Sequence, residues 1–455
     1  MHSVMPLDTA QSGGRTYAET VSRGFYAHHV GGLSGKHDNV RTFWEDEVIR
    51  MTLRPLLGPC VDRCRRERRG VRILDLGSGA GQGYEILTSI PVADLGPDAE
   101  LRYVLASDEI DCYLGLDLSL AMVTKGMENY HREPRARFAV ADLREGLGPA
   151  VDEPPFDVYY SSYGSLSHLD TPDLRKLLLQ VVAHARPGAL IVLDLVGRLS
   201  PEWPGYWYTA NEADTVREYS MSYLYDPEER ALGQIERFPL RLWTGRELRE
   251  FCAAIDEASP RSLVPVRVED RSIFVGRHVD TLEYGPIVPP LRQVVNRLLE
   301  PDVRTNLNNL RVTIDPVPDQ DGVNEFFAEL ACCWNTLVDF AAVRLLGRRV
   351  DLVRMDGWSG FPPALQTALI NMDRVVDSVA WFRTSDVRAN LVEPQLAYLV
   401  RDLEISLQRG LGCGHGLLAV LNVGQNRRSR GLGPKDQGAQ VSGAASEVAA
   451  DTSGL

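Results

Sequence analysis

Cysteine is scarce in this chain. Seven cysteines stand among 455 residues, and no C-x-x-C pair occurs among them. An odd number of cysteines without paired spacing argues against a disulfide framework and against a structural zinc site. We therefore expect no bound metal and a reducing, cytoplasmic location.

Long apolar runs are missing as well. No stretch of about 18 consecutive apolar residues is present, so we expect no transmembrane helix and no membrane partner. The segment Met1 to Arg15 is polar, which does not fit a secretory signal. A composition of 44% hydrophobic and 24% charged residues is typical of a globular protein with a sizeable core.

Basic residues are outnumbered by acidic ones. The chain has 49 Lys and Arg against 62 Asp and Glu, a formal net charge of −13. Binding to a phosphate backbone rewards clustered Lys and Arg, so we do not expect a nucleic-acid partner. An acidic surface favours a cationic small substrate, although many acidic proteins are acidic only because charge keeps them in solution.

Strand and helix patterns alternate from position 71 onward. Five short apolar runs, typical of buried parallel strands, span 71–76, 113–118, 137–140, 156–160 and 189–196. A helix lies between the last two runs, with Thr171 as its expected cap and Pro172 at its first position. This alternation predicts a doubly wound α/β sheet.

The character of the chain changes after about position 284, where helical patterns replace strand patterns. Residues 264–279 suggest a sixth strand and residues 414–421 a seventh. A lone apolar strand after a helical region needs a partner in a sheet, so we interpret the helical region as an insertion. The alternative is a separate C-terminal helical domain. The predicted parts are an N-terminal helical cap (1–60), an α/β core (61–284), a helical insertion or cap domain (285–410), a returning strand of the core (411–424) and a disordered tail (425–455).

The strongest local signal is a glycine loop, Asp75-Leu76-Gly77-Ser78-Gly79-Ala80-Gly81, between the first strand and a helix. Glycines allow a tight turn and the close approach of a ligand, and the helix N-terminus offers N–H groups to an anion. The dinucleotide pattern G-x-G-x-x-G fails in every register, and the lysine of a phosphate-binding P-loop is absent. A glycine-rich turn without a ligand is the plain alternative.

This segment resembles the first motif of class I S-adenosylmethionine-dependent methyltransferases, D/E-x-G-x-G-x-G. The similarity extends over about residues 60–255 and points to the bacterial small-molecule type. It implies a seven-stranded Rossmann-like sheet with an N-terminal helical cap, and S-adenosylmethionine as the cofactor. The helical stretch 285–410 is an addition to that core.

The resemblance also assigns roles to single residues. The methionine part of the cofactor would be held by Asp75, Gly77, Ser78, Gly79 and Gly81. At the end of the second strand Asp117 would accept both ribose hydroxyls beside Leu118, and after the third strand Asp142 would bond the adenine amino group with Leu143 lending its N–H. Ser161, at the end of the fourth strand, and Tyr26, in a segment that closes over the cofactor, complete the set; for Tyr26 a surface turn is the alternative.

One spacing departs from the usual pattern. Asp117 follows Gly77 by 40 positions, whereas the ribose-binding acid usually comes about 20 residues after the loop. We attribute the difference to an insertion over about 91–112.

Methyl transfer requires alignment of the acceptor and exclusion of water more than covalent help from the protein. A base is needed only where the acceptor holds a proton at the working pH. His168, after the fourth strand, is the catalytic candidate, with a structural role before the next helix as the alternative.

These observations predict a methyltransferase (EC 2.1.1) that modifies a small-molecule acceptor, either a metabolite or an amino-acid-like compound, and that forms a possible homodimer. The alternatives are a methyltransferase acting on protein or RNA, and a non-catalytic S-adenosylmethionine-binding protein. Tyr160-Ser161-Ser162-Tyr163 replaces the N-P-P-Y-type segment that marks methylation of exocyclic amino groups.

Overall fold

The structure is a computed structural model that describes residues 14–26, 31–33, 35–92, 102–233 and 235–426. Its centre is a seven-stranded sheet, as the sequence predicts, and the strand order is β3-β2-β1-β4-β5-β9-β8. The strands are β1 (Val71–Leu76), β2 (Ile110–Asp117), β3 (Ala136–Val140), β4 (Val158–Ser161), β5 (Leu190–Gly197), β8 (Arg261–Arg271) and β9 (Gly416–Asn426). β1 to β5 run parallel, and β9 is antiparallel to both of its neighbours.

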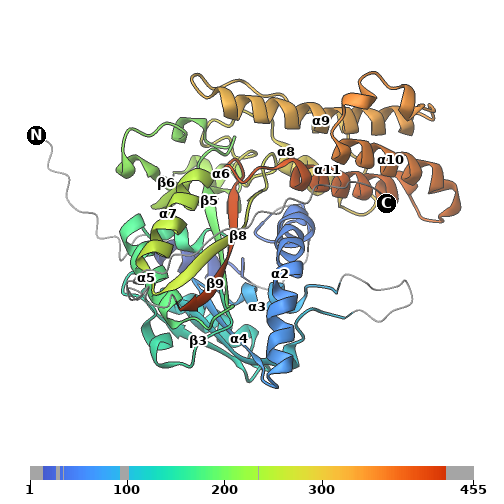
Figure 1. Cartoon of the computed structure of the whole chain (residues 1–455). Helices are drawn as coiled ribbons and strands as arrows, with labels where there is room; N and C mark the ends of the chain where they lie inside the picture. The colour runs from blue at the N-terminus through green and yellow to red at the C-terminus, as the bar shows by residue number, and fades with distance from the viewer. Residues whose placement is uncertain (1–13, 27–30, 34, 93–101, 234, 427–455) are drawn as a thin grey trace, which may run out of the picture.

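Helices cover both faces of the sheet (Figure 1). One face carries α2 (Asp46–Arg66), α3 (Gln82–Thr88) and α4 (Leu120–Asn129), and the other carries α5 (Thr171–His184) and α7 (Gly245–Ala258). Each helix buries an apolar stripe against the strands, which is the driving force for this layering.

The start of α5 differs from the prediction by one residue. The carboxylate of Asp170, rather than the hydroxyl of Thr171, accepts a hydrogen bond from the N–H of Asp173 at 2.8 Å. Thr171 already belongs to the first turn, so its side chain is past the capping position. Thr244 caps α7 by the same kind of bond to Glu247.

The helical region enters and leaves the sheet at one point. β8 ends at Arg271, which pairs directly with Gly416 at the start of β9. The predicted strand over 264–279 is wrong at its end, because Ser272 adopts a left-handed φ of 60° that stops the extended backbone. The apolar residues that follow pack instead into the core of the helical region.

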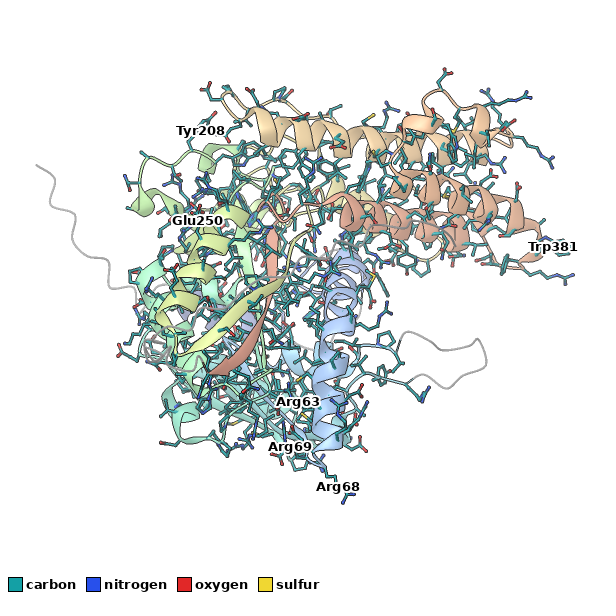
Figure 2. All side chains as sticks on the ribbon, viewed as in Figure 1. Arg63, Arg68, Arg69, Tyr208, Glu250 and Trp381 are labelled. Carbon is teal, nitrogen blue, oxygen red and sulfur yellow. The ribbon has the colours of Figure 1, made fainter. Side chains whose placement is uncertain are left out.

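The helices between β8 and β9 are α8 (Leu291–Leu298), α9 (Asp321–Leu345), α10 (Pro363–Ser378) and α11 (Glu393–Leu407). They form a layer above the carboxyl ends of the strands (Figure 1), and they share one apolar core with Val40, Trp44 and Val48 near the start of α2. Figure 2 places Trp381 at the outer tip of this layer and Arg63, Arg68 and Arg69 at the opposite end of the molecule, where α2 ends.

Within the described part of the chain, α9 is the one helix long and apolar enough to cross a membrane. Of its most apolar window, 56% is buried inside the protein, as in the core helix of a globular domain.

A helix and a hairpin surround the carboxyl edge of the sheet. The helix is α1 (Gly14–Ser22), and the hairpin consists of β6 (Val216–Ser220) and β7 (Arg237–Trp243) with the short helix α6 (Pro227–Ala231) between them. The hairpin was not predicted from the sequence. β7 pairs with β5 at Val196 and Gly197, just past the point where β4 ends. Because β9 occupies the other edge of β5, β7 continues the line of β4 over the end of the sheet.

Candidate functional site

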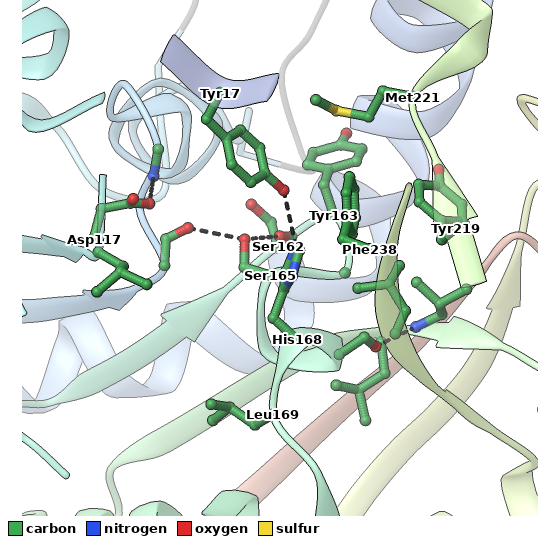
Figure 3. Close-up of a pocket in the computed structure, with 18 of the residues that line it drawn as sticks. Tyr17, Asp117, Ser162, Tyr163, Ser165, His168, Leu169, Tyr219, Met221 and Phe238 are labelled. Atoms are coloured by element: carbon green, nitrogen blue, oxygen red, sulfur yellow. Dashed lines mark hydrogen bonds between the residues drawn. The ribbon is translucent and has the colours of Figure 1, made fainter. Parts of the chain in front are cut away.

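A cavity of about 710 Å³ opens at the carboxyl ends of β1, β2, β4 and β5 (Figure 3). This volume is typical of sites for small ligands, and the edge is where open α/β sheets bind them. The sequence-predicted residues that line it are Tyr26, Gly77, Ser78, Gly79, Asp117, Leu118, Asp142, Leu143 and His168.

The glycine loop forms one wall. Gly77 and Gly79 both adopt left-handed backbone conformations, with φ of 74° and 52°, which disfavour any residue with a Cβ. At Gly77 a Cβ would collide with Ser165 at 2.6 Å, whereas at Gly79 the nearest atom, in the ring of Tyr26, lies 4.0 Å away. The loop is therefore packed behind Gly77 and open in front of Gly79.

Asp117 ends β2 directly beside the loop. One carboxylate oxygen accepts the N–H of Gly79 at 2.9 Å and the other accepts the N–H of Ser119 at 2.8 Å. Burial raises the pKa of Asp117. Each oxygen has a second lone pair, so the carboxylate can also accept hydrogen bonds from a vicinal diol in the cavity. Leu118, 50% exposed, offers an apolar contact at the same place.

Asp142 and Leu143 line the cavity after β3. The guanidinium of Arg144 binds the Asp142 carboxylate, with Nη2 2.6 Å from Oδ2, and this hydrogen bond lowers the pKa of Asp142. A ligand amino group at this position would share the carboxylate with Arg144.

Asp75, predicted to hold the methionine part of the cofactor, does not line the cavity. Asp75 is 1% exposed and is not among the lining residues. Its carboxylate accepts a hydrogen bond from the Tyr113 hydroxyl and lies so close to Gly83 that a Cβ there would collide with it. Burial raises the pKa of Asp75 to about 7. This carboxylate supports the loop from beneath.

Gly81 and Ser161 also lie outside the cavity lining. Gly81 precedes α3 with a φ of 89°, and a Cβ there would strike Tyr130 and Phe138, so its role is packing. Ser161 is fully buried within the end of β4.

His168 faces the cavity from the turn after β4. Its ring stacks on Phe238 of β7 with centroids 5.1 Å apart, and its Nε2 lies 2.8 Å from the hydroxyl of Tyr17 on α1 (Figure 3). The surrounding protein lowers the pKa of His168 to about 4, so the imidazole is neutral near pH 7.

Tyr26 lies beside Gly79. It also contacts Lys36, which the sequence analysis did not predict. The ammonium of Lys36 lies 2.9 Å from the centre of the Tyr26 ring, in a cation–π contact. Burial lowers the pKa of Lys36 well below its ordinary value.

Arginines form a second unpredicted wall. Arg41, Arg271 and Arg277 line the cavity, and the first two contact the ring of Tyr163 from 3.0 and 4.6 Å. Fully buried Glu45 bonds Arg277 at 2.8 Å. Burial alone would raise the pKa of Glu45, but the neighbouring guanidinium groups hold it well below its ordinary value.

The remaining unpredicted lining comes from the hairpin and from the start of β9. Tyr219, Met221 and Phe238 supply apolar surface, and His415 enters between Gly414 and Gly416. The only sequence signal for His415 is its position between two glycines just before an apolar strand. A Cβ on either glycine would collide with Arg271, so the glycines let this segment pass close to β8.

Part of the chain matches a known family model. Residues 100–188 match the family model described as "Methyltransferase domain". The match starts after the glycine loop. No curated protein sequence matches the chain.

Several solved structures are similar to the chain at low identity. A putative methyltransferase from Haloferax volcanii, in complex with the Trm112 methyltransferase activator, is 15% identical with a TM-score of 0.28; the match covers 45% of this chain and 66% of that one. DhpI in complex with SAH is 15% identical, with a TM-score of 0.35 and coverage of 58% and 93%. An S-adenosylmethionine-dependent methyltransferase from Clostridium acetobutylicum is 16% identical, with a TM-score of 0.29 and coverage of 50% and 87%.

Proposed function

We propose that this chain is a class I S-adenosylmethionine-dependent methyltransferase that transfers a methyl group to a small-molecule acceptor, a metabolite or an amino-acid-like compound. The match of residues 100–188 to a methyltransferase domain supports the proposal. The observation that carries the proposal is the position of Asp117. Its carboxylate stands at the cavity edge, bonded to the N–H of Gly79, where a nucleoside diol can reach it beside an open glycine loop.

The residues present fit this cofactor. The loop around Gly79 leaves room for the methionine part of the cofactor. Asp117 would accept hydrogen bonds from the ribose hydroxyls, and Leu118 and Leu143 would pack against the adenine. When bound, S-adenosylmethionine supplies an electrophilic methyl carbon on a sulfonium.

The protein aligns the acceptor with the cofactor and excludes water from the site. The acceptor occupies the part of the cavity beyond β4, under Tyr219 and Phe238 of the hairpin and next to His168. Holding both reactants in line can supply much of the rate enhancement. Because α1 and the hairpin stand over this part, a small acceptor fits better than a folded protein or an RNA, and the net charge of −13 also disfavours RNA.

His168 is one candidate base for an acceptor that carries a proton. Its neutral imidazole is competent to accept one near pH 7. Its Nε2 is bonded to the Tyr17 hydroxyl, so in this arrangement the base and the covering helix α1 are coupled.

The test is calorimetric titration of the protein with S-adenosylmethionine and S-adenosylhomocysteine. We expect saturable binding, and we expect Asp117→Ala to weaken it by about 10- to 100-fold, because hydrogen bonds to a charged group contribute about 1.5–3 kcal/mol. Asp62→Ala, on the exposed side of α2, is the matched control and should bind as the wild type does. Absence of binding by the wild-type protein would sink the proposal.

A further inference from the structure

We propose that His415 is the general base of this site, that Glu202 positions it, and that the acceptor atom is the oxygen of a hydroxyl group. The inference rests on the proposed function and names the substrate class of the same cavity.

His415 is anchored through one nitrogen only. Its Nδ1 lies 2.7 Å from Oε2 of Glu202, while His415 itself lines the cavity. Among the described residues, none forms a hydrogen bond with Nε2. The imidazole is thus held through Nδ1, and its Nε2 is left to accept a hydrogen bond from a ligand, although His415 is only 8% exposed.

Glu202 is suited to fix this orientation. It is fully buried, and it is held in turn by the hydroxyl of Ser200 at 3.1 Å and by the backbone N–H of His278. Burial alone would raise the pKa of Glu202, but its interaction with His415 and the hydrogen bond from the backbone N–H of His278 hold it below its ordinary value. An ionised Glu202 favours the proton on Nδ1 of His415, which leaves the lone pair of Nε2 for a substrate proton.

The other groups around His415 do not compete for this role. His278 stacks on it at 6.2 Å but is fully buried, and burial lowers its pKa to about 3. Trp203 and Tyr219 contact the ring at 5.5 and 6.3 Å, and Arg271 lies beside Gly416, where it is paired with Asp194. Glu202 is therefore the one acidic partner of His415 among the described residues.

The place of His415 in the sheet suits an acceptor. The carbonyl of His415 accepts the N–H of Gly197 at 3.2 Å, at the carboxyl end of β5. β5 is separated from β1 by β4 alone, and strands lie about 4.8 Å apart. An acceptor between His415 and the glycine loop therefore lies across the ends of β4 and β5. His168 is in the same cavity, but its Nε2 is already bonded to Tyr17.

A base with an open nitrogen indicates an acceptor that must lose a proton. A neutral amine attacks with its own lone pair, whereas a hydroxyl becomes a strong nucleophile only as its proton leaves. The acceptor oxygen forms a bond to the methyl carbon while the methyl–sulfur bond breaks and its electron pair stays on sulfur. The hydroxyl proton passes to Nε2 of His415 and then to water. Met221 and Phe238 nearby favour a hydroxyl on an apolar or aromatic body.

The first test measures methyl transfer from labelled S-adenosylmethionine to a panel of phenols, enols, alcohols, amines and thiols. We expect turnover of hydroxyl compounds, with kcat at least about 100-fold lower in His415→Asn. In Glu202→Gln we expect kcat to fall by a larger factor than KM changes. The kcat of Glu202→Asp should lie between those of the wild type and Glu202→Gln. The matched control is His131→Asn, an exposed histidine outside the cavity.

Undiminished turnover in His415→Asn would overturn the inference. It would also be overturned if the wild-type protein methylated only amines or thiols, or methylated none of the hydroxyl compounds. S-adenosylhomocysteine binding is measured on the same samples. Normal binding together with one of these results refutes the inference and leaves the methyltransferase assignment intact, whereas loss of binding by the wild type refutes the assignment itself.

A second test does not depend on the acceptor. Diethyl pyrocarbonate is applied to the full chain with S-adenosylhomocysteine bound, and modified histidines are mapped by peptide mass spectrometry. We expect His415 to be carbethoxylated at Nε2 and His278 to be protected by burial. If His415 stays as unreactive as His278, its Nε2 does not open to the cavity and the inference fails.

Discussion

Asp75 supports a ligand-binding loop without contacting what the loop binds. Its carboxylate fills the space beneath the turn and meets the Tyr113 hydroxyl, and its second oxygen has no hydrogen-bond partner among the described residues. A buried carboxylate with one partner favours its protonated form, which is why the pKa of Asp75 rises to about 7.

The raised pKa predicts a pH dependence. The folded state holds the Asp75 proton up to about pH 7, while the unfolded chain releases it near pH 4. Stability from this group is therefore greatest at low pH and is lost as pH rises from about 4 to 7. In Asp75→Asn we expect the free energy of unfolding to vary less between pH 5 and 8 than in the wild type, measured by urea titration with tryptophan fluorescence. An unchanged slope would show that Asp75 is already ionised at pH 5.

The residue types at strand ends were predictable, but their contacts were not. Asp117 and His168 follow buried strands whose apolar runs fix their place at one edge of the sheet. Lys36, Arg271 and His415 come from segments far apart in the sequence, and only tertiary packing brings them to that edge. Whether the Asp75 side chain points into the cavity or beneath the loop depends on its hydrogen bond with Tyr113. No local sequence pattern reveals that contact.

Among the elements, the buried parallel strands were predictable and the covering hairpin was not. β1, β4 and β5 appear as mostly apolar runs because both faces of the sheet are covered there, whereas the edge strand β3 leaves Arg137 and Val140 exposed. β6 reads Val-Arg-Glu-Tyr-Ser, with Arg217 half-buried and Glu218 exposed, so it lacks the alternation or apolar run that marks a strand. Its existence depends on pairing with β7 and on the free edge of β5 past β4.

The helix α1 contacts the site through Tyr17, which gives a second prediction. Tyr17→Phe removes the hydrogen bond to His168 Nε2, a contribution of about 1 kcal/mol. If α1 holds Tyr26 against the cofactor, the Kd for S-adenosylhomocysteine rises about 5-fold. Tyr103→Phe, at an exposed tyrosine outside the cavity, serves as the control in the same calorimetric titration. Equal affinities of the two variants would mean that α1 does not contribute to cofactor binding.

At the scale of the whole molecule, one buried carboxylate joins three segments. Glu45, just before α2, binds Arg271 at the end of β8, Arg277 after it, and Arg292 on α8. The three guanidinium groups are nearly fully buried. Arg271 also binds Asp194 and Arg292 also binds Asp38, so removing Glu45 leaves Arg277 as a buried cation without a carboxylate partner among the described residues.

We therefore expect Glu45→Gln to lower the free energy of unfolding by about 3–5 kcal/mol. Glu47→Gln, two positions on and partly exposed, should change it by less than about 0.5 kcal/mol. Because the pKa of Glu45 is depressed, its contribution is present above about pH 4 and is lost as pH falls further. Chemical denaturation at pH 7 checks both variants. Similar losses in the two would mean that the arginines find other partners.

The position of β9 has a consequence for the order in which the protein assembles. β9 fills the gap between β5 and β8, yet the chain passes through α8, α9, α10 and α11 before it reaches Gly416. During synthesis on the ribosome, the edges of β5 and β8 that pair with β9 therefore stay unpaired until the helical layer and β9 have emerged. That layer packs against the start of α2, and β9 follows it directly in the chain. The edges of β5 and β8, which could pair with another nascent chain, are therefore closed only after the helical layer has been made.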